Sequence, residues 1–380
     1  MKNIFKEINY FSINDNNLVS GERILSVDAL RGFDMFWIIG GKEIFRSLDK
    51  IFNNSTTDFI KSELKHAEWL EFNFYDLIMP LFLFLVGISM VYSFRKRLGR
   101  EPSKSKLWKH IIVRFIWLWI LGMVVQGNLL TYDIDEIKFY SNTLQAIAIG
   151  YLIAAVFILY TNVFYQVLLT FGLMLIYWLL LEIIHVPGFG TGLYTPDGNS
   201  AIYIDKIILG KFWAEGNWSW IISSLNFGAT TMLGVFAGYL LQSQKKPISK
   251  FYYLLFSGII MLIIGLIWDF WHPSIRRLWT SSMVFYTGGL CLLLLALFYY
   301  VIDVLQYRKW SRMFIIIGSN AIGAYVSAHI FDFKLVSQVF VGGLEKYVGT
   351  WYPFILSLGG FMVLYLILKF MHKNKIFIKV

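Results

Sequence analysis

Long apolar runs alternate with short polar segments along nearly the whole chain. A run of about 20 apolar residues is long enough to cross the ~30 Å hydrocarbon core of a bilayer as a helix. The pattern predicts ten such helices, or eleven if the stretch before the sixth forms a separate re-entrant piece. The predicted spans are residues 24–45, 74–94, 108–127, 143–160, 163–184, 219–242, 251–269, 279–301, 313–332 and 351–371.

The composition favours the same class of protein. Hydrophobic residues make up 57% of the 380 residues and charged residues 15%, whereas soluble domains carry about 25% charged residues. We therefore expect an all-α polytopic membrane protein. Residues 1–22 are predicted to form a polar cytoplasmic arm, and residues 23–380 a single transmembrane domain. The start of the chain lacks the apolar core and cleavage site of a signal peptide, so we expect no removable leader.

Positive charge gathers in alternate loops, and the loop "TYDIDEIKFY" between two of them is acidic. Positive loops mark the cytoplasmic side of a membrane protein. Both termini are therefore predicted to be cytoplasmic, with His66 on the outer side near the start of the second span. This distribution accounts for the net charge of +10 without a nucleic-acid partner. The positive segments are 95–109, 245–250, 308–312 and 369–379.

A polar segment runs directly into the second span in "KSELKHAEWLEFNFYDLIMPLFLFLVGISM", residues 61–90. It carries His66, Glu68 and Trp69, and Asp76 lies at the membrane boundary. A histidine held by a carboxylate is a common arrangement for a general base or nucleophile near neutral pH. The ten-residue spacing does not itself place the two in contact, and a merely solvated histidine remains the alternative.

Three charged residues, Asp28, Arg31 and Asp34, occur inside the first predicted span at intervals of three. This spacing puts them on one broad face of a helix, where they can pair. Charges within a bilayer are costly and should face protein or water. They form either a self-neutralising triad that fixes helix packing or a polar ligand contact near the cytoplasmic end.

Neutral polar residues also enter the spans. Gln145 begins the fourth span and Asn320 lies in the ninth; such groups either join helices or contact a ligand. The long outer segment 185–218, which contains Asn199, is rich in turn-forming and aromatic residues, so we expect an ordered cap over a site. The sequence has no metal-ligand spacing, no phosphate-binding Gly-Lys-Ser/Thr loop and no Gly-x-Ser-x-Gly elbow, and no metal is expected.

Several stretches together resemble the heparan-alpha-glucosaminide N-acetyltransferase family. "RILSVDALRGFDMFW" resembles its opening Arg-x-x-Ser-x-Asp-x-x-Arg-Gly motif, and "KHAEWLEFNFYDLIMPLFLFLVGISM" its His-Ala-x-Trp, Asp-Leu and Pro-x-Phe-x-Phe pattern. "VPGFGTGLYTPDGNSAIYID" resembles the outer loop of its bacterial members, and "RRLWTSSMVFYTGG" and "GSNAIGAYV" fit later spans. The resemblance covers the chain in order from Arg23 onward.

The resemblance implies a membrane enzyme that takes acetyl groups from cytosolic acetyl-CoA and delivers them to a terminal glucosamine on the other side. It implies that His66 is the catalytic residue, that the protein is a homodimer, and that the chain is a bacterial member in the inner membrane. Two departures stand out. Lys42 occupies the place of an asparagine implicated in catalysis in animal members, and "WAEG" replaces an Asp-Pro-Glu-Gly run.

We expect Asp76 to orient the His66 ring, and Gln145 or Asn320 to donate a hydrogen bond to the reaction's oxyanion. The predicted sugar contacts are Trp69, Glu68 and Asn199; the predicted coenzyme A contacts are Asp28, Arg31, Arg95 and Arg312. The alternatives are a transporter for an amino sugar or cell-envelope glycan, and an acyltransferase with another acceptor.

Overall fold

A computed structural model describes residues 24–216 and 218–378. Within these residues the secondary structure is helical, and the β-pairing consists of an isolated bridge between Val186 and Gly190. The all-α class is therefore confirmed. The predicted arm, residues 1–22, lies outside the described residues.

Two compact units make up the described chain, and each is considered by itself. The mid-chain unit is Met79–Leu293, and the terminal unit combines Ile24–Ile78 with Leu294–Val380. The second predicted span therefore begins at the end of one unit and continues in the other.

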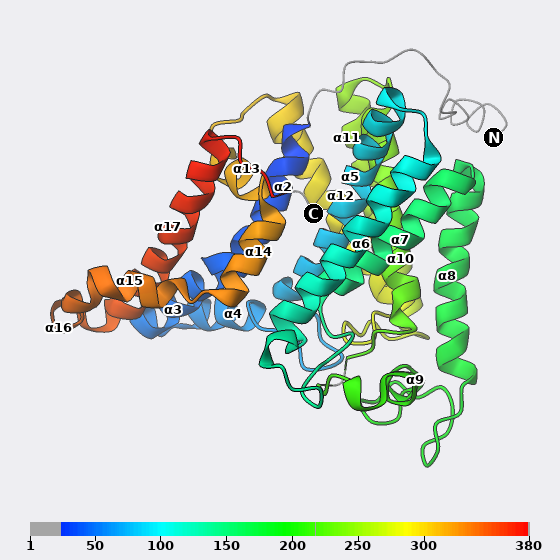
Figure 1. The fold of residues 1–380 in the computed structure, drawn as a ribbon, viewed down its shortest axis with the longest axis horizontal. Coiled ribbons are helices and arrows are strands. Elements are labelled where there is room, and N and C mark those ends of the chain that lie inside the picture. Colours follow the sequence, from blue (N-terminus) through cyan, green and yellow to red (C-terminus); the bar gives the residue numbers. More distant parts are fainter. Residues whose placement is uncertain (1–23, 217, 379–380) are drawn as a thin grey trace. The chain divides into compact units, whose positions relative to one another are not determined.

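The mid-chain unit is a bundle of long helices (Figure 1). In it α10 packs against α7 and α8, and α6 packs against α7. Its helices are α5 (Ile78–Arg100), α6 (Lys104–Gln126), α7 (Thr143–Tyr160), α8 (Val163–Ile183), α9 (Ser200–Leu209), α10 (Ser223–Gln242), α11 (Pro247–Asp269) and the first part of α12 (Ser281–Tyr299), with the short turns η4 (Leu129–Thr131) and η5 (Gly210–Phe212). The first residue of α5 and the last turns of α12 belong to the terminal unit.

Apolar side chains cover the outside of α6, α8 and α11. Ile116, Leu168 and Ile260 are among the exposed large hydrophobic residues, and less than a quarter of the apolar stretch of each of these helices is buried. A soluble protein rarely exposes such surfaces. These faces are suited to lipid, and the chain is a multi-pass membrane protein.

The terminal unit joins the two ends of the described chain. Helix α2 packs along α13, and α15 packs against α17 (Figure 1). Its elements are α2 (Leu25–Phe36), η2 (Trp37–Gly41), α3 (Lys42–Phe52), α4 (Ser55–Glu63), η3 (Phe74–Leu77), η6 (Tyr300–Val304), α13 (Arg312–Gly318), α14 (Ala321–Ile330), α15 (Phe333–Val341), η7 (Gly342–Leu344), α16 (Glu345–Val348), η8 (Gly349–Trp351) and α17 (Tyr352–Lys373).

Two glycines allow α2 and α13 to approach at backbone distance. A Cβ atom on Gly32 would overlap the Phe314 carbonyl, and one on Gly318 would overlap the Asp28 carbonyl. Small residues permit this kind of close helix packing in membranes. The contact fixes the helix that carries the charged residues of the first predicted span.

The number of spans is lower than the sequence predicts. The described residues contain eight helices long and apolar enough to cross a membrane, or nine if the bent pair α13 and α14 counts as one. The predicted span 24–45 is absent from this set, because charged residues interrupt its apolar sequence and a π-helical turn separates α2 from α3. The predicted span 313–332 bends by 76° between α13 and α14.

Candidate active site

The loop that carries His66 is closed at its base by Asn73. Helix α4 starts at a capping box in which Asn54 accepts from the Thr57 N–H, and it ends at Glu63. The chain then loops back, and the Asn73 side-chain amide donates to the carbonyls of Ser62 (3.1 Å) and Lys65 (3.2 Å). Residues 64–73 therefore return beside the end of α4, which brings the start of the second span to His66.

Asp76 holds this loop from inside. Its side chain is buried, and Oδ2 accepts hydrogen bonds from the backbone N–H groups of Ala67 and Asn73, both at 3.1 Å. Its Oδ1 lies 2.8 Å from His66 Nδ1. The predicted pairing of His66 with Asp76 is present, and the same carboxylate binds the loop directly after the histidine and again at Asn73.

The partner of Nδ1 assigns the tautomer of His66. A carboxylate accepts hydrogen bonds, so the neutral imidazole carries its proton on Nδ1 and donates it to Asp76. Nε2 is then the basic nitrogen. The His66 side chain is 44% exposed, whereas that of Asp76 is 0% exposed. The pair thus combines a fixed buried carboxylate with a reachable base, which suits proton abstraction or nucleophilic attack.

Tyr75 and Lys42 complete the surroundings of the ring. The Tyr75 ring centroid is 4.8 Å from that of His66, with the planes tilted by 54°. Lys42 Nζ lies 4.1 Å from the centroid of the same Tyr75 ring. Lys42 is the first residue of α3, after the π-helical turn. The structure therefore brings Lys42 to the histidine site, although the sequence leaves its role unassigned.

Of the predicted sugar contacts, two lie on the His66 loop: Glu68 is exposed and Trp69 half-buried. Asn199 belongs to the mid-chain unit and caps α9, where it accepts from the Ile202 N–H at 2.8 Å and donates to the carbonyls of Thr195 and Pro196. Its amide orders the loop that is predicted to lie on the outer side, and direct contact with a sugar stays a prediction.

The two predicted oxyanion donors are engaged elsewhere. Gln145 donates to the Phe139 carbonyl at 2.6 Å and accepts from the Ser141 N–H at 2.9 Å. Asn320 donates to the Ile376 carbonyl at 3.0 Å and accepts from the Ile378 N–H at 2.9 Å. Each amide thus holds a neighbouring chain segment, and a role toward the substrate stays a prediction.

The charged residues of α2 do not form a complete triad. Arg31 donates to Asp28 at 3.2 Å. Asp34 is fully buried, and neither of its carboxylate oxygens has a hydrogen-bond partner in the described part of the chain. The self-neutralising triad is therefore reduced to an Asp28–Arg31 pair, because the Asp34 oxygens receive no hydrogen bond from Arg31.

The predicted phosphate contacts on the positive loops occupy different units. Arg95 near the end of α5 donates to Gln242 at 3.3 Å, and Arg312 is exposed at the start of α13. Among residues 24–216 and 218–378, no group of three or more His, Cys, Asp or Glu side chains is arranged to hold a metal ion.

Sequence reasoning missed a second histidine, His272, in the mid-chain unit. Its Nε2 accepts from the Ser281 N–H at 2.9 Å, and Nδ1 lies 2.8 Å from the Tyr194 hydroxyl, which donates to Glu182 at 2.6 Å. Burial lowers the pKa of His272 to about 3, so the ring is neutral and Nδ1–H donates to Tyr194. This chain of bonds ties the loop that contains Tyr194 to the end of α8. The only sequence signal is a histidine just after the seventh predicted span.

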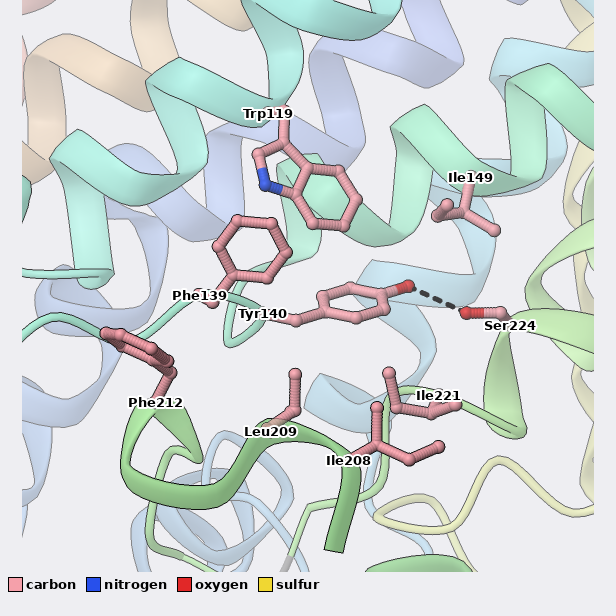
Figure 2. A pocket seen from close by; sticks show the side chains of 9 residues that line it. All are labelled: Trp119, Phe139, Tyr140, Ile149, Ile208, Leu209, Phe212, Ile221 and Ser224. Carbon is pink, nitrogen blue, oxygen red and sulfur yellow. Dashed lines mark hydrogen bonds between the residues drawn. The ribbon is translucent and has the colours of Figure 1, made fainter. Parts of the chain in front are cut away.

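A cavity of about 550 Å³ also lies in the mid-chain unit (Figure 2). Aromatic and aliphatic side chains line it, and the Tyr140 hydroxyl and Ser224 Oγ are hydrogen-bonded at 3.0 Å. The residues around it are Trp119, Phe139, Tyr140, Ile149, Ile208, Leu209, Phe212, Ile221 and Ser224. None of the predicted site residues is among them.

Residues 23–196 match the model of a family described as heparan-alpha-glucosaminide N-acetyltransferase, catalytic. Two similar curated proteins bear the name heparan-alpha-glucosaminide N-acetyltransferase. The one from Mus musculus is 24% identical over 382 residues, covering 82% of this chain and 54% of that protein. The one from Homo sapiens is 24% identical over 381 residues, covering 82% and 53%. The chain spans about half the length of these relatives. The matched segment contains both His66 and Asp76, and residues 23–196 are thus similar to the catalytic part of the heparan-alpha-glucosaminide N-acetyltransferase family.

Proposed function

We propose that this protein is a membrane N-acetyltransferase that moves the acetyl group of cytosolic acetyl-CoA to the amine of a glucosamine-type sugar at the outer face. The observation that carries the proposal is the His66–Asp76 pair, with a buried carboxylate bound to Nδ1 of a half-exposed imidazole. The family match across this segment and the names of the relatives support the same chemistry.

His66 acts through Nε2. In direct transfer the amine nitrogen attacks the thioester carbonyl while Nε2 takes its proton, and the carbonyl electrons move onto oxygen. The tetrahedral intermediate then collapses: the carbon–sulfur bond breaks, and the thiolate of coenzyme A takes the proton from the imidazolium. In the two-step route, Nε2 attacks the thioester carbonyl, and coenzyme A leaves as the thiolate. The amine then attacks the acetyl-imidazole, the nitrogen–acetyl bond of the imidazole breaks, and Nε2 takes the proton that the amine gives up.

Asp76 is the positioning residue of this pair. Its negative charge stabilises the imidazolium that forms when Nε2 takes a proton, and its hydrogen bond keeps the ring in the productive tautomer. Because its other oxygen accepts two backbone N–H groups of the same loop, the carboxylate is fixed before the substrate binds. Such preorganisation lowers the cost of reaching the transition state.

The positive-inside pattern supports the proposed direction of transfer. Coenzyme A carries several phosphate charges that lipid excludes, whereas the acetyl group is small and neutral. Positive loops on the cytoplasmic side, with Arg95 and Arg312 among their residues, are suited to phosphate binding. The thioester then meets the amine at His66, on the side predicted to be outer.

The test is acetyl transfer by purified full-length protein in lipid nanodiscs. Coenzyme A thiol and N-acetylated glucosamine are both measured, with and without glucosamine. We expect thiol release that depends on the amine and is lost in His66→Ala. His185→Ala is the matched control, because His185 is an exposed histidine of the predicted outer loop. Failure of the wild-type protein to acetylate glucosamine or its short oligomers would overturn the proposal, and sugar flux without acetyl-CoA would favour the transporter.

A further inference from the structure

The proposed transfer builds negative charge on the thioester carbonyl oxygen. When the amine nitrogen bonds to the carbonyl carbon, the π electrons move onto that oxygen. Enzymes usually place a hydrogen-bond donor or a cation at this point, because stabilising the oxyanion is often the largest single contribution to the rate. The His66–Asp76 pair handles the proton and does not supply such a group.

The amides predicted for this role are bound to other parts of the chain. Gln145 holds the loop at Phe139 and Ser141, and Asn320 holds the segment at Ile376 and Ile378. Turning either amide toward a substrate would break two hydrogen bonds and release the neighbouring segment that they hold.

Lys42 is placed beside the imidazole by an aromatic ring. Its Nζ lies 4.1 Å from the Tyr75 ring centroid, within the range of a cation–π contact, and the same ring is 4.8 Å from the His66 ring. The Tyr75 ring therefore contacts both the ammonium group of Lys42 and the imidazole of His66. The adjacent carboxylate, Glu43, is paired with Lys334 at 2.9 Å and Arg46 at 3.5 Å, so two other cations also share its charge.

We propose that Lys42 is a catalytic residue that stabilises the oxyanion of the acetyl transfer, and that the Tyr75 ring positions its ammonium group for this role. The inference rests on the proposed function. Lys42 remains protonated throughout. The negative charge forms on the oxygen beside the ammonium group. The electron pair on this oxygen then re-forms the carbonyl double bond as the carbon–sulfur bond breaks, and the negative charge leaves on the sulfur of coenzyme A. The amine proton passes through His66 alone.

Four variants test the assignment by their steady-state kinetics. Lys42→Ala should lower kcat by about 100-fold with a smaller change in KM, since the interaction forms in the transition state. Lys42→Arg, which keeps the positive charge, should retain activity within about tenfold of wild type. Tyr75→Leu should lower kcat more than Tyr75→Phe does, because only the phenylalanine variant keeps the aromatic ring on which the ammonium rests.

Chemical rescue separates catalysis from structural support. Ethylammonium added to Lys42→Ala should raise kcat in a saturable way, because a small cation can fill the space of the deleted side chain. It should leave His66→Ala inactive. The readout must be N-acetylglucosamine measured by mass, since a free alkylamine can itself accept acetyl groups and release thiol.

The outcomes divide cleanly. If Lys42→Ala keeps the wild-type kcat, the role of Lys42 is overturned. The role is also overturned if Lys42→Ala and Lys42→Arg lose the same activity and ethylammonium does not restore it. The proposed function stands in both cases. If the Lys42 variants change only KM, and only for acidic amino sugars, Lys42 binds the acceptor. This result also overturns its catalytic role. A wild-type protein that makes no N-acetylglucosamine contradicts the proposed function itself.

Discussion

The two histidine sites of this protein use the same side chain in opposite ways. His66 is half-exposed and donates Nδ1–H to a buried carboxylate, whereas His272 is fully buried and bonded at both ring nitrogens to a hydroxyl and a backbone N–H. The first arrangement leaves a basic nitrogen on a reachable ring. The second uses the ring to join segments of the chain. Solvent access and the charge of the partner thus separate a histidine suited to reaction from one suited to joining segments of the chain.

The sharpest test of this contrast is His66→Ala. We expect acetyl transfer to fall by about 10³-fold or more, because the proton acceptor is gone. The thermal midpoint should change little, because the side chain is 44% exposed. Product formation and a thermal melt on the same preparation measure the two effects. A folded variant that keeps its activity would break the comparison.

Asp76→Asn should reduce kcat by on the order of 10²–10⁴-fold. The amide nitrogen would face His66 Nδ1 and favour the wrong tautomer. The amide oxygen still accepts from the loop N–H groups, so most of the protein should remain folded. A pH–rate profile checks this, since loss of the carboxylate should shift the pH at which His66 titrates. An unchanged profile would argue against the pairing.

Asp205 and His272, two buried groups of the mid-chain unit, should make the free energy of unfolding depend on pH in opposite directions. Burial raises the pKa of Asp205 to about 7, although backbone N–H groups of Ile221 and Trp220 lower it. Its unfolded value is near 3.9, so the folded state holds the extra proton between pH 4 and 7, and stability falls as pH rises through that window. His272, with a folded pKa of about 3 and an unfolded value near 6.5, loses stability as pH falls from 6.5 to 3.

Each slope approaches about 1.4 kcal/mol per pH unit, so the two largely cancel in the wild type between pH 4 and 6.5. In Asp205→Asn only the pH dependence due to His272 should remain, so this variant should become less stable on acidification. His272→Gln should show the reverse. Thermal melts of the three proteins across this pH range measure the effect, and parallel curves would show that neither group is linked to unfolding.

The smallest effect should come from Tyr194→Phe, which removes the hydroxyl between His272 and Glu182. We expect a loss of about 1–2 kcal/mol of stability, typical of a buried hydrogen-bonded hydroxyl. A double-mutant cycle with His272→Gln should then show that the two losses are not additive. Full additivity would mean that the bond of 2.8 Å between them contributes nothing.

The sequence predicts the helical class and both members of the His66–Asp76 pair, because apolar runs and reactive residue types are local signals. Their contact is not local. It depends on Asn73 closing the loop, which no periodicity reveals. The role of His272 could not be predicted for a related reason, since its partner Tyr194 lies 78 residues away in the sequence. Gln145 and Asn320 show the limit for polar residues in spans: spacing cannot distinguish an amide bound to its own protein from one directed at a ligand.

The backbone contact at Gly32 and Gly318 has a consequence for any mutational library of this protein. A scan selected on acetylation would score both positions as intolerant even of alanine, in the same class as His66. Neither glycine takes part in the chemistry; each would fail because its Cβ overlaps a carbonyl of the facing helix. Sorting the library first by the amount of folded protein in the membrane, and only then by product, would separate the two kinds of essential residue.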